Sequence, residues 1–166
     1  DLLEWMLGEP ISVFAKSRTA LVDIETEDTG VAIIQFKSGA IGVVEATTAT
    51  RPKDLEGSLS ILGEKGSVVI GGFAVNEMQT WNVVEADSHE ENLLADNSEL
   101  PPNIYGFGHC RYLKNVCESL LLNEKALVDG LEGRKSLKLI HAIYESIETG
   151  KEVFMKYQPN KCKLGQ

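Results

Sequence analysis

DGLEGRKSLKLIHAIYESIETGK, residues 129–151, carries the strongest structural signal in this chain of 166 residues. Its pattern predicts one long helix, because Asp129 and Glu132 have the spacing of a capping box and Gly150 stands where a left-handed C-cap ends a helix. Between these ends, apolar residues recur at three- and four-residue steps and predict a stripe that faces a core: Leu137, Ile140, Ile143, Tyr144 and Ile147. By itself this helix indicates packing rather than chemistry.

Composition and charge limit the classes of protein to which the chain can belong. A hydrophobic content of 43% with 25% charged residues is typical of a soluble globular domain. The net charge of −9 disfavours nucleic acid as a partner, because few cations are present to release counterions from a phosphate backbone. No apolar run is long enough to cross a bilayer and no leader opens the chain, so we expect a cytoplasmic protein without a membrane partner.

The three cysteines indicate reduced thiols. An odd number does not suit a disulfide framework, and the spacing of Cys110, Cys117 and Cys162 matches no zinc pattern. We therefore expect no metal site, and we expect Cys110 and Cys117, seven positions apart on one helix, to be small core residues.

The rest of the chain predicts strands in hairpins, bracketed by helices. Residues 1–8 look like the tail of a helix whose start is missing, so we expect the chain to be part of a longer protein. The expected elements are strands at 10–24, 29–36, 41–49, 55–62, 67–70, 73–78, 80–86 and 152–157, an exposed loop at 87–103, and a helix at 106–122 before the long one.

This order predicts an α+β fold with an antiparallel-rich mixed sheet and helices packed on one face. The strand at 29–36 lacks a clean apolar–polar alternation, which suggests that both of its faces are covered. We expect helices on one face and another subunit on the other; the alternative is a strand central in a sandwich. No GxGxxG follows a strand, so a dinucleotide-binding fold within this chain is not expected.

Several separate phrases resemble one enzyme family. FKSGAIGVVEA (36–46), LGEKGS (62–67), DLLEWMLG (1–8) and the stretch from Leu127 to Val153 are similar to the C-terminal domain of the Gfo/Idh/MocA oxidoreductases. Within that family they most resemble the 3-dehydrogenases of UDP-N-acetyl sugars and their uronates. The resemblance covers nearly the whole chain.

The resemblance implies a domain rather than a complete enzyme. Residues 1–158 would form the substrate-binding and oligomer-forming domain of a NAD- or NADP-dependent nucleotide-sugar dehydrogenase, followed by a flexible tail at 159–166. The Gly-rich nucleotide loop and the catalytic Lys and His would lie upstream of Asp1, so the chain alone is expected to be inert and to bind no cofactor. The parent enzyme would form a homo-oligomer through the sheet.

Three residues are candidates for contact with the nucleotide-sugar substrate. Tyr105 and His109 flank a helix start, where backbone N–H groups favour an anion, and Arg51 follows a strand end and suits a phosphate or carboxylate. The alternatives are a surface histidine without a ligand and a solvated loop arginine. Glu45 could also face the sugar, although an edge or interface role is favoured.

A rival interpretation is a non-catalytic protein-interaction module. In that case the sheet face would be the surface for a different partner, and the loop at 87–103 would be its recognition element. The two interpretations differ in whether a cofactor-binding domain belongs to the same protein.

Overall fold

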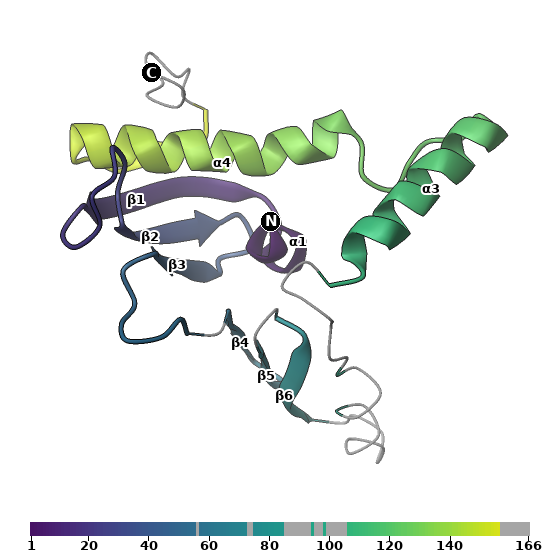
Figure 1. The fold of residues 1–166 in the computed structure, drawn as a ribbon, viewed down its shortest axis with the longest axis horizontal. Coiled ribbons are helices and arrows are strands. Elements are labelled where there is room, and N and C mark those ends of the chain that lie inside the picture. The colour runs from purple at the N-terminus through teal and green to yellow at the C-terminus, as the bar shows by residue number, and fades with distance from the viewer. Residues whose placement is uncertain (56, 73–74, 85–93, 95–97, 99–105, 157–166) are drawn as a thin grey trace. The chain divides into compact units, whose positions relative to one another are not determined.

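The computed structural model describes residues 1–55, 57–72, 75–84, 94, 98 and 106–156 (Figure 1). The chain divides into two compact units, Asp1–Thr50 with Val128–Gln166, and Arg51–Leu127. The division into one domain at 1–158 and a tail stays a prediction.

The first unit is built on a four-stranded antiparallel sheet in the order β3-β2-β1-β7. Its elements are α1 (Leu2–Leu7), β1 (Pro10–Arg18), β2 (Thr29–Phe36), β3 (Ile41–Thr47), α4 (Gly130–Thr149) and β7 (Val153–Phe154). In Figure 1, α4 runs along the sheet over β1. The predicted hairpin of β2 and β3 is confirmed, with Gly39 at φ 90 in its turn, a conformation that glycine adopts without strain.

Both predicted ends of α4 are confirmed. Asp129 accepts hydrogen bonds from the N–H groups of Leu131 and Glu132, and Gly150 ends the helix in the left-handed conformation. The predicted inner stripe was wrong in part, because the fully buried positions of α4 are Leu139, Ala142 and Ser146.

The apolar arc of α4 is wider than the face that the sheet covers. Ile143 and Ile147 pack against the core, whereas Leu137 is 52% exposed and Ile140 is 41% exposed. Small residues at 142 and 146 let the helix approach the sheet closely, and this decides which side of α4 faces inward.

The core lies between α4 and one face of this sheet: Val13, Ala15, Ala32, Ile34, Phe36, Leu139, Ala142, Val153 and Met155. A Cβ added at Gly42 would lie 2.9 Å from the ring of Phe36, so β3 needs a glycine beside that ring. The hydroxyl of Ser146 joins three segments, since it accepts from the Ala15 N–H at 2.9 Å and donates to the Lys151 carbonyl at 2.6 Å.

Strand β1 ends earlier than the predicted residue 24. The backbone N–H groups of Ala20, Leu21 and Val22 all donate to one oxygen of Asp28, at 2.8, 2.6 and 3.0 Å. These donors turn toward the carboxylate and leave the strand ladder, so the strand stops at Arg18.

The described part of the second unit comprises a three-stranded antiparallel sheet and the helix α3. Its elements are β4 (Leu59–Gly63), β5 (Gly66–Gly71), β6 (Glu77–Val83) and α3 (Gly108–Leu122), with the sheet order β4-β5-β6. The first strand starts at Leu59 rather than at the predicted residue 55, and a single strand, β6, lies across the region predicted as two. The predicted loop at 87–103 lies outside the described residues except for Leu94 and Ser98.

The helix predicted at 106–122 is confirmed as α3, which ends at Asn123 in the left-handed conformation. Cys110 and Cys117 are exposed free thiols, so their predicted core role was wrong. Among the described residues, no helix is both long and apolar enough to span a bilayer.

Across the described residues the fold is α+β, as the element order predicted. Every strand pair in them is antiparallel, and one helix layer covers one face of the larger sheet. The predicted parallel component is not seen in this part of the chain.

Candidate functional site

The structure places two of the three predicted substrate residues in the second unit. Arg51 is exposed in the segment between β3 and β4, and His109 is exposed in the first turn of α3. Tyr105 lies outside the described residues. Arg51 lies in a connecting segment and His109 lies in a helix, so the two residues stand on different elements.

The start of α3 has the backbone geometry that the sequence suggested. Its N-cap is Phe107, whose side chain makes no capping hydrogen bond, in contrast to the carboxylate of Asp129 on α4. The first N–H groups of α3 therefore have no side-chain acceptor from their own N-cap, which suits an anionic ligand.

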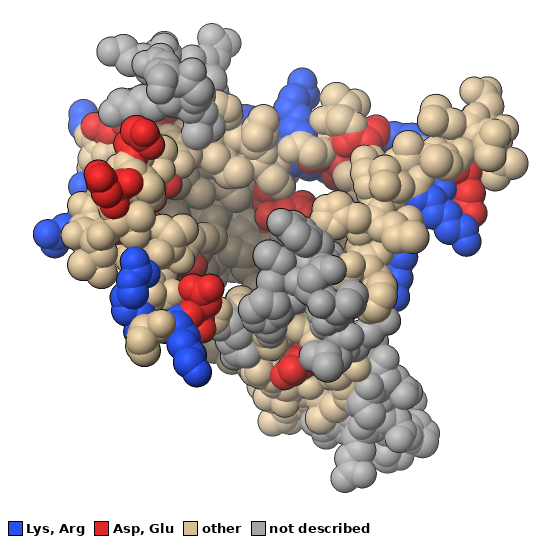
Figure 2. Space-filling view, in the orientation of Figure 1, with Lys and Arg blue, Asp and Glu red and all other residues tan. Residues whose placement is uncertain are grey.

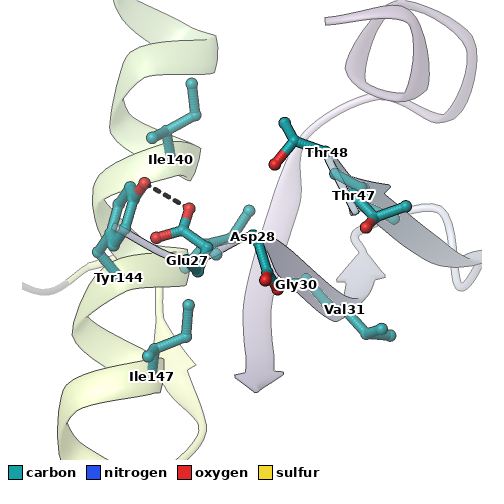
Figure 3. A pocket seen from close by; sticks show the side chains of 13 residues that line it. Glu27, Asp28, Gly30, Val31, Thr47, Thr48, Ile140, Tyr144 and Ile147 are labelled. Atoms are coloured by element: carbon teal, nitrogen blue, oxygen red, sulfur yellow. Dashed lines mark hydrogen bonds between the residues drawn. The ribbon is translucent and has the colours of Figure 1, made fainter. Parts of the chain in front are cut away.

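A hollow of about 360 Å³ lies in the first unit between α4 and the ends of β2 and β3 (Figure 3). One wall consists of Ile140, Ile143, Tyr144 and Ile147 of α4; the other consists of Glu27, Asp28, Gly30, Val31, Ala32, Val44, Ala46, Thr47 and Thr48. The lining is mainly apolar, with polar groups at its rim.

The polar rim of this hollow is organised by two carboxylates. Tyr144 donates to Glu27 at 2.8 Å, drawn as the dashed line in Figure 3, and this hydrogen bond, together with burial, raises the pKa of Tyr144. The hydrogen bonds from the N–H groups of Leu21, Val22 and Ala20 lower the pKa of Asp28 to about 2. At neutral pH Asp28 is therefore an anion and Tyr144 a neutral hydroxyl.

These ionisation states do not suit acid–base chemistry at this hollow. A general acid or base works best with a pKa near the working pH, and both groups are shifted away from it. The carboxylate of Asp28 instead accepts hydrogen bonds from backbone N–H groups of the loop at 19–28. Sequence reasoning saw an acidic turn here but missed the hollow, because Glu27 and Tyr144 are 117 positions apart.

A second hollow of about 850 Å³ lies beside α1, β7 and the first half of α4. Lys135, Lys138 and Lys156 line it together with Glu4 and Glu9. Lys135 is held by both oxygens of Glu132, at 2.7 and 2.8 Å, and this contact raises its pKa. The charges of this hollow are mixed and do not favour one ligand charge.

On the face shown in Figure 2, basic side chains in blue and acidic ones in red are interspersed among uncharged residues. Within the described part of the chain, no cluster of three or more His, Cys, Asp or Glu could hold a metal ion.

The described residues do not fit a nicotinamide dinucleotide. Such a cofactor needs a Gly-rich turn that joins a strand to a helix start, where the N–H groups hold the diphosphate. The start of α4 is already occupied by its own carboxylate, Asp129. Within the described residues, the chain from β1 to β3 leads through no such turn into a helix.

The face of the larger sheet opposite α4 is exposed and apolar at its centre. Its exposed members are Phe14, Val31, Ile33, Ile41, Val43 and Phe154, of which Ile33 is 50% and Val43 62% exposed. Patches of this kind on a sheet are typical of protein interfaces. One face of the hairpin is therefore left uncovered by the described residues, as the predicted subunit contact requires.

Known structures are similar over nearly the whole chain. The WlbA dehydrogenase from Chromobacterium violaceum, solved with NADH and UDP-GlcNAcA, is 42% identical with a TM-score of 0.82, and the match covers 97% of this chain and 44% of that one. The WlbA dehydrogenase from Bordetella pertussis, solved with the same two ligands, is 39% identical with a TM-score of 0.83, over 95% of this chain and 45% of that one.

A curated relative is more distant. Myo-inositol 2-dehydrogenase from Thermotoga maritima is 25% identical over 158 residues, which are 92% of this chain and 45% of that protein. The chain thus spans less than half the length of each of these three relatives.

Membership of a family is shown by a match to a sequence profile, which does not depend on any single relative. The sequence profile described as the oxidoreductase family, C-terminal alpha/beta domain, matches residues 1–155. The resemblance found in the sequence is thereby confirmed, and the chain belongs to the Gfo/Idh/MocA family of oxidoreductases, to its C-terminal domain.

Proposed function

We propose that this chain is the substrate-binding and self-associating domain of a NAD- or NADP-dependent nucleotide-sugar dehydrogenase. The observation that carries the proposal is the 42% and 39% identity, along nearly the whole chain, to two dehydrogenases solved with NADH and UDP-GlcNAcA. The myo-inositol relative is much less similar, at 25%. A cytoplasmic location stays a prediction.

In this proposal the chain supplies the substrate wall and the parent enzyme supplies the cofactor. Tyr105, His109 and Arg51 contact the nucleotide sugar, through the helix start of α3 and the segment after β3. No residue of the chain is proposed as catalytic.

The parent enzyme also self-associates through the exposed face of the four-stranded sheet. Support comes from the apolar centre of this face, Ile33 and Val43 above all, which no described helix covers. The same exposed face is the feature that favours the second candidate, a non-catalytic module that binds a different protein.

Turnover by the full-length parent enzyme tests the proposal. With NAD or NADP, UDP-GlcNAcA should give NADH or NADPH, seen as absorbance of the reduced nicotinamide, whereas myo-inositol should not. Turnover of myo-inositol alone would contradict the nucleotide-sugar assignment. The absence of both activities and of any cofactor-binding domain in the parent protein would favour the interaction module.

A further inference from the structure

The hollow between α4 and the ends of β2 and β3 combines an apolar lining with negative charge that no neighbouring cation compensates. The described residues that line it include Glu27 and Asp28 but no Lys, Arg or His. Neither carboxylate forms an ion pair with a described residue. A cation in this hollow would therefore face two carboxylates without competition from a basic side chain.

Asp28 supplies a buried acceptor that the loop at 19–28 leaves unused. The residue is 2% exposed, and in Figure 3 it lies between Tyr144 on one wall of the hollow and Thr47 on the other. One carboxylate oxygen, Oδ2, accepts the three backbone N–H groups described above, whereas Oδ1 is buried and has no hydrogen-bond partner among the described residues. Thr29 is the weakest contributor to the low pKa of Asp28, and its hydroxyl bonds to Thr47 at 2.9 Å. A ligand that donates to Oδ1 would relieve the cost of leaving this oxygen unpaired.

Glu27 supplies a second acceptor, which Tyr144 holds in place. The Tyr144 hydroxyl donates to Oε1 of Glu27 at 2.8 Å and ties the loop to α4 (Figure 3). Oε2 makes no hydrogen bond to a described residue. Thr48 adds a hydroxyl from the opposite wall, which can accept a further hydrogen bond.

The rest of the hollow suits an apolar body of modest size. Most of its lining is aliphatic: Val31, Ala32, Val44, Ala46, Ile140, Ile143 and Ile147. Its volume of about 360 Å³ lies at the small end of the range of small-molecule pockets, about 300–1,000 Å³. The negative charge of the hollow disfavours a nucleotide sugar, because the phosphates of such a ligand are anionic.

We propose that this hollow binds a small primary amine in its ammonium form, with the apolar body against the isoleucines of α4 and the ammonium at Glu27 and Asp28. An ammonium brings the two properties that the hollow lacks, a positive charge and N–H donors. A small molecule is favoured over a lysine side chain of another protein, because the volume falls within the range of small-molecule pockets. This site adds to the proposed function and does not depend on it.

Isoleucine-methyl NMR of the 166-residue chain tests the site with n-hexylamine as the probe. This amine is an ammonium ion at neutral pH, like the lysine side chain, whose pKa is about 10.4. The methyl signals of Ile140, Ile143 and Ile147 should shift saturably, with a dissociation constant of about 1 mM or below, as expected for so small a ligand. The exposed Ile33 and Ile41 lie on the opposite face of the sheet and should not shift.

Three further probes separate the charge and the N–H donors from the apolar contact. Hexan-1-ol has the same hexyl group without a charge, hexanoate has a negative charge, and hexyltrimethylammonium has a positive charge without N–H donors. Each should bind about tenfold more weakly than n-hexylamine or worse, because a charge-assisted hydrogen bond contributes at least about that factor.

Two variants test the residues of the site. Glu27→Gln keeps the shape of the side chain and should weaken n-hexylamine binding about five- to tenfold, since this partly exposed carboxylate is partly screened by water. Ala46→Leu places a larger side chain in the hollow at an exposed position of β3 and should abolish the methyl shifts.

Glu25→Gln is the matched control for the charge change. Glu25 is an exposed residue of the same loop and does not line the hollow, so the dissociation constant should stay within about twofold, because salt and water screen such a distant charge. Circular dichroism of every variant checks that the fold is kept.

The outcomes decide both the place and the chemistry of the site. No shift at any isoleucine up to about 10 mM, tenfold above the expected dissociation constant, or shifts confined to Ile33 and Ile41, would overturn the site. Equal binding of n-hexylamine and hexan-1-ol would overturn the ammonium assignment.

The remaining outcomes concern another occupant of the hollow. Signals of Ile140, Ile143 and Ile147 that change with protein concentration but not with the amine would show that a second protein chain fills the hollow, and would overturn the proposal. The same titration of the full-length parent enzyme should shift the same three isoleucines. A parent enzyme in which they do not respond would show that another part of that protein fills the hollow, which also overturns the proposal.

Discussion

Removal of the Ser146 hydroxyl should destabilise the first unit strongly. The side chain is fully buried on α4, and its oxygen is bonded to β1 and to the chain that leads into β7. Ser146→Ala deletes both hydrogen bonds and changes the side-chain volume little. The substitution therefore measures the hydrogen bonds rather than the packing.

The expected loss in the free energy of unfolding follows from how well each hydrogen-bond partner of Ser146 can be hydrated once the hydroxyl is removed. The N–H of Ala15 belongs to a residue that is 1% exposed, so it has no access to water and should cost about 1–3 kcal/mol when left without an acceptor. The carbonyl of Lys151 belongs to an exposed residue and can be hydrated, so its loss should cost about 1 kcal/mol. The sum is about 2–4 kcal/mol.

Urea unfolding followed by circular dichroism and tryptophan fluorescence measures this loss. Trp5 lies in α1 of the first unit and Trp81 in β6 of the second, so fluorescence of variants that keep one tryptophan assigns the effect to a unit. For a chain of this size, about 2–4 kcal/mol corresponds to a fall in Tm of roughly 5–15 °C.

Thr149→Ala is the matched control, because its exposed hydroxyl donates to the Glu145 carbonyl of the same helix and otherwise accepts one long hydrogen bond, 3.4 Å, from the exposed Lys151 N–H. Its effect should stay within about 0.5 kcal/mol. Amide hydrogen exchange at Ala15 adds a local readout and should speed up in Ser146→Ala only. A loss below about 0.5 kcal/mol with unchanged exchange at Ala15 would refute the reasoning.

Four further predictions concern association, cofactor, substrate and pH. Ile33→Lys or Val43→Lys should convert a self-associating chain into a monomer in light scattering, because either places a charge in the apolar centre of the sheet face; an unchanged mass would count against that interface. Calorimetry should detect no NAD(H) or NADP(H) binding to this chain, and saturable binding in the low micromolar range would contradict the domain assignment. In the full-length enzyme, His109→Ala and Arg51→Ala should each lower kcat/KM for the UDP-sugar about ten- to a hundredfold with unchanged cofactor affinity, the loss expected for one charge-assisted hydrogen bond; unaltered kcat/KM would mean that neither touches substrate. The pKa of Asp28 in the folded chain, about 2, is below its ordinary value of 3.8, so the stabilisation by its carboxylate should be present above about pH 4 and lost as the pH falls toward 2. Asp28→Asn should lack this pH-dependent part of the stability when urea midpoints are measured across that range. An identical pH dependence in both proteins would contradict the prediction.

The sequence alone determined the elements whose signals are local. The ends of α4 follow from Asp129 and Gly150, because an N-cap carboxylate and a left-handed glycine act on backbone groups within one turn. The β2–β3 hairpin follows in the same way from its glycine turn. The family resemblance, which rests on several such phrases, was equally visible in the sequence.

The candidate substrate site could be predicted only in outline. The start of α3 near residue 108 was visible, since a helix start is a local feature, and His109 lies there as expected. Whether it acts together with Arg51 depends on contacts between distant segments, which no pattern along the chain encodes.

Tertiary structure decided what depends on distant partners. The inner face of α4 is set by the close approach of β1 at Ala142 and Ser146, so the apolar periodicity that pointed to Leu137 and Ile140 did not identify it. The end of β1 depends on a carboxylate ten residues further on, at Asp28. Helical and strand periodicity specify which residues share a face, but only packing against another element decides which face is buried.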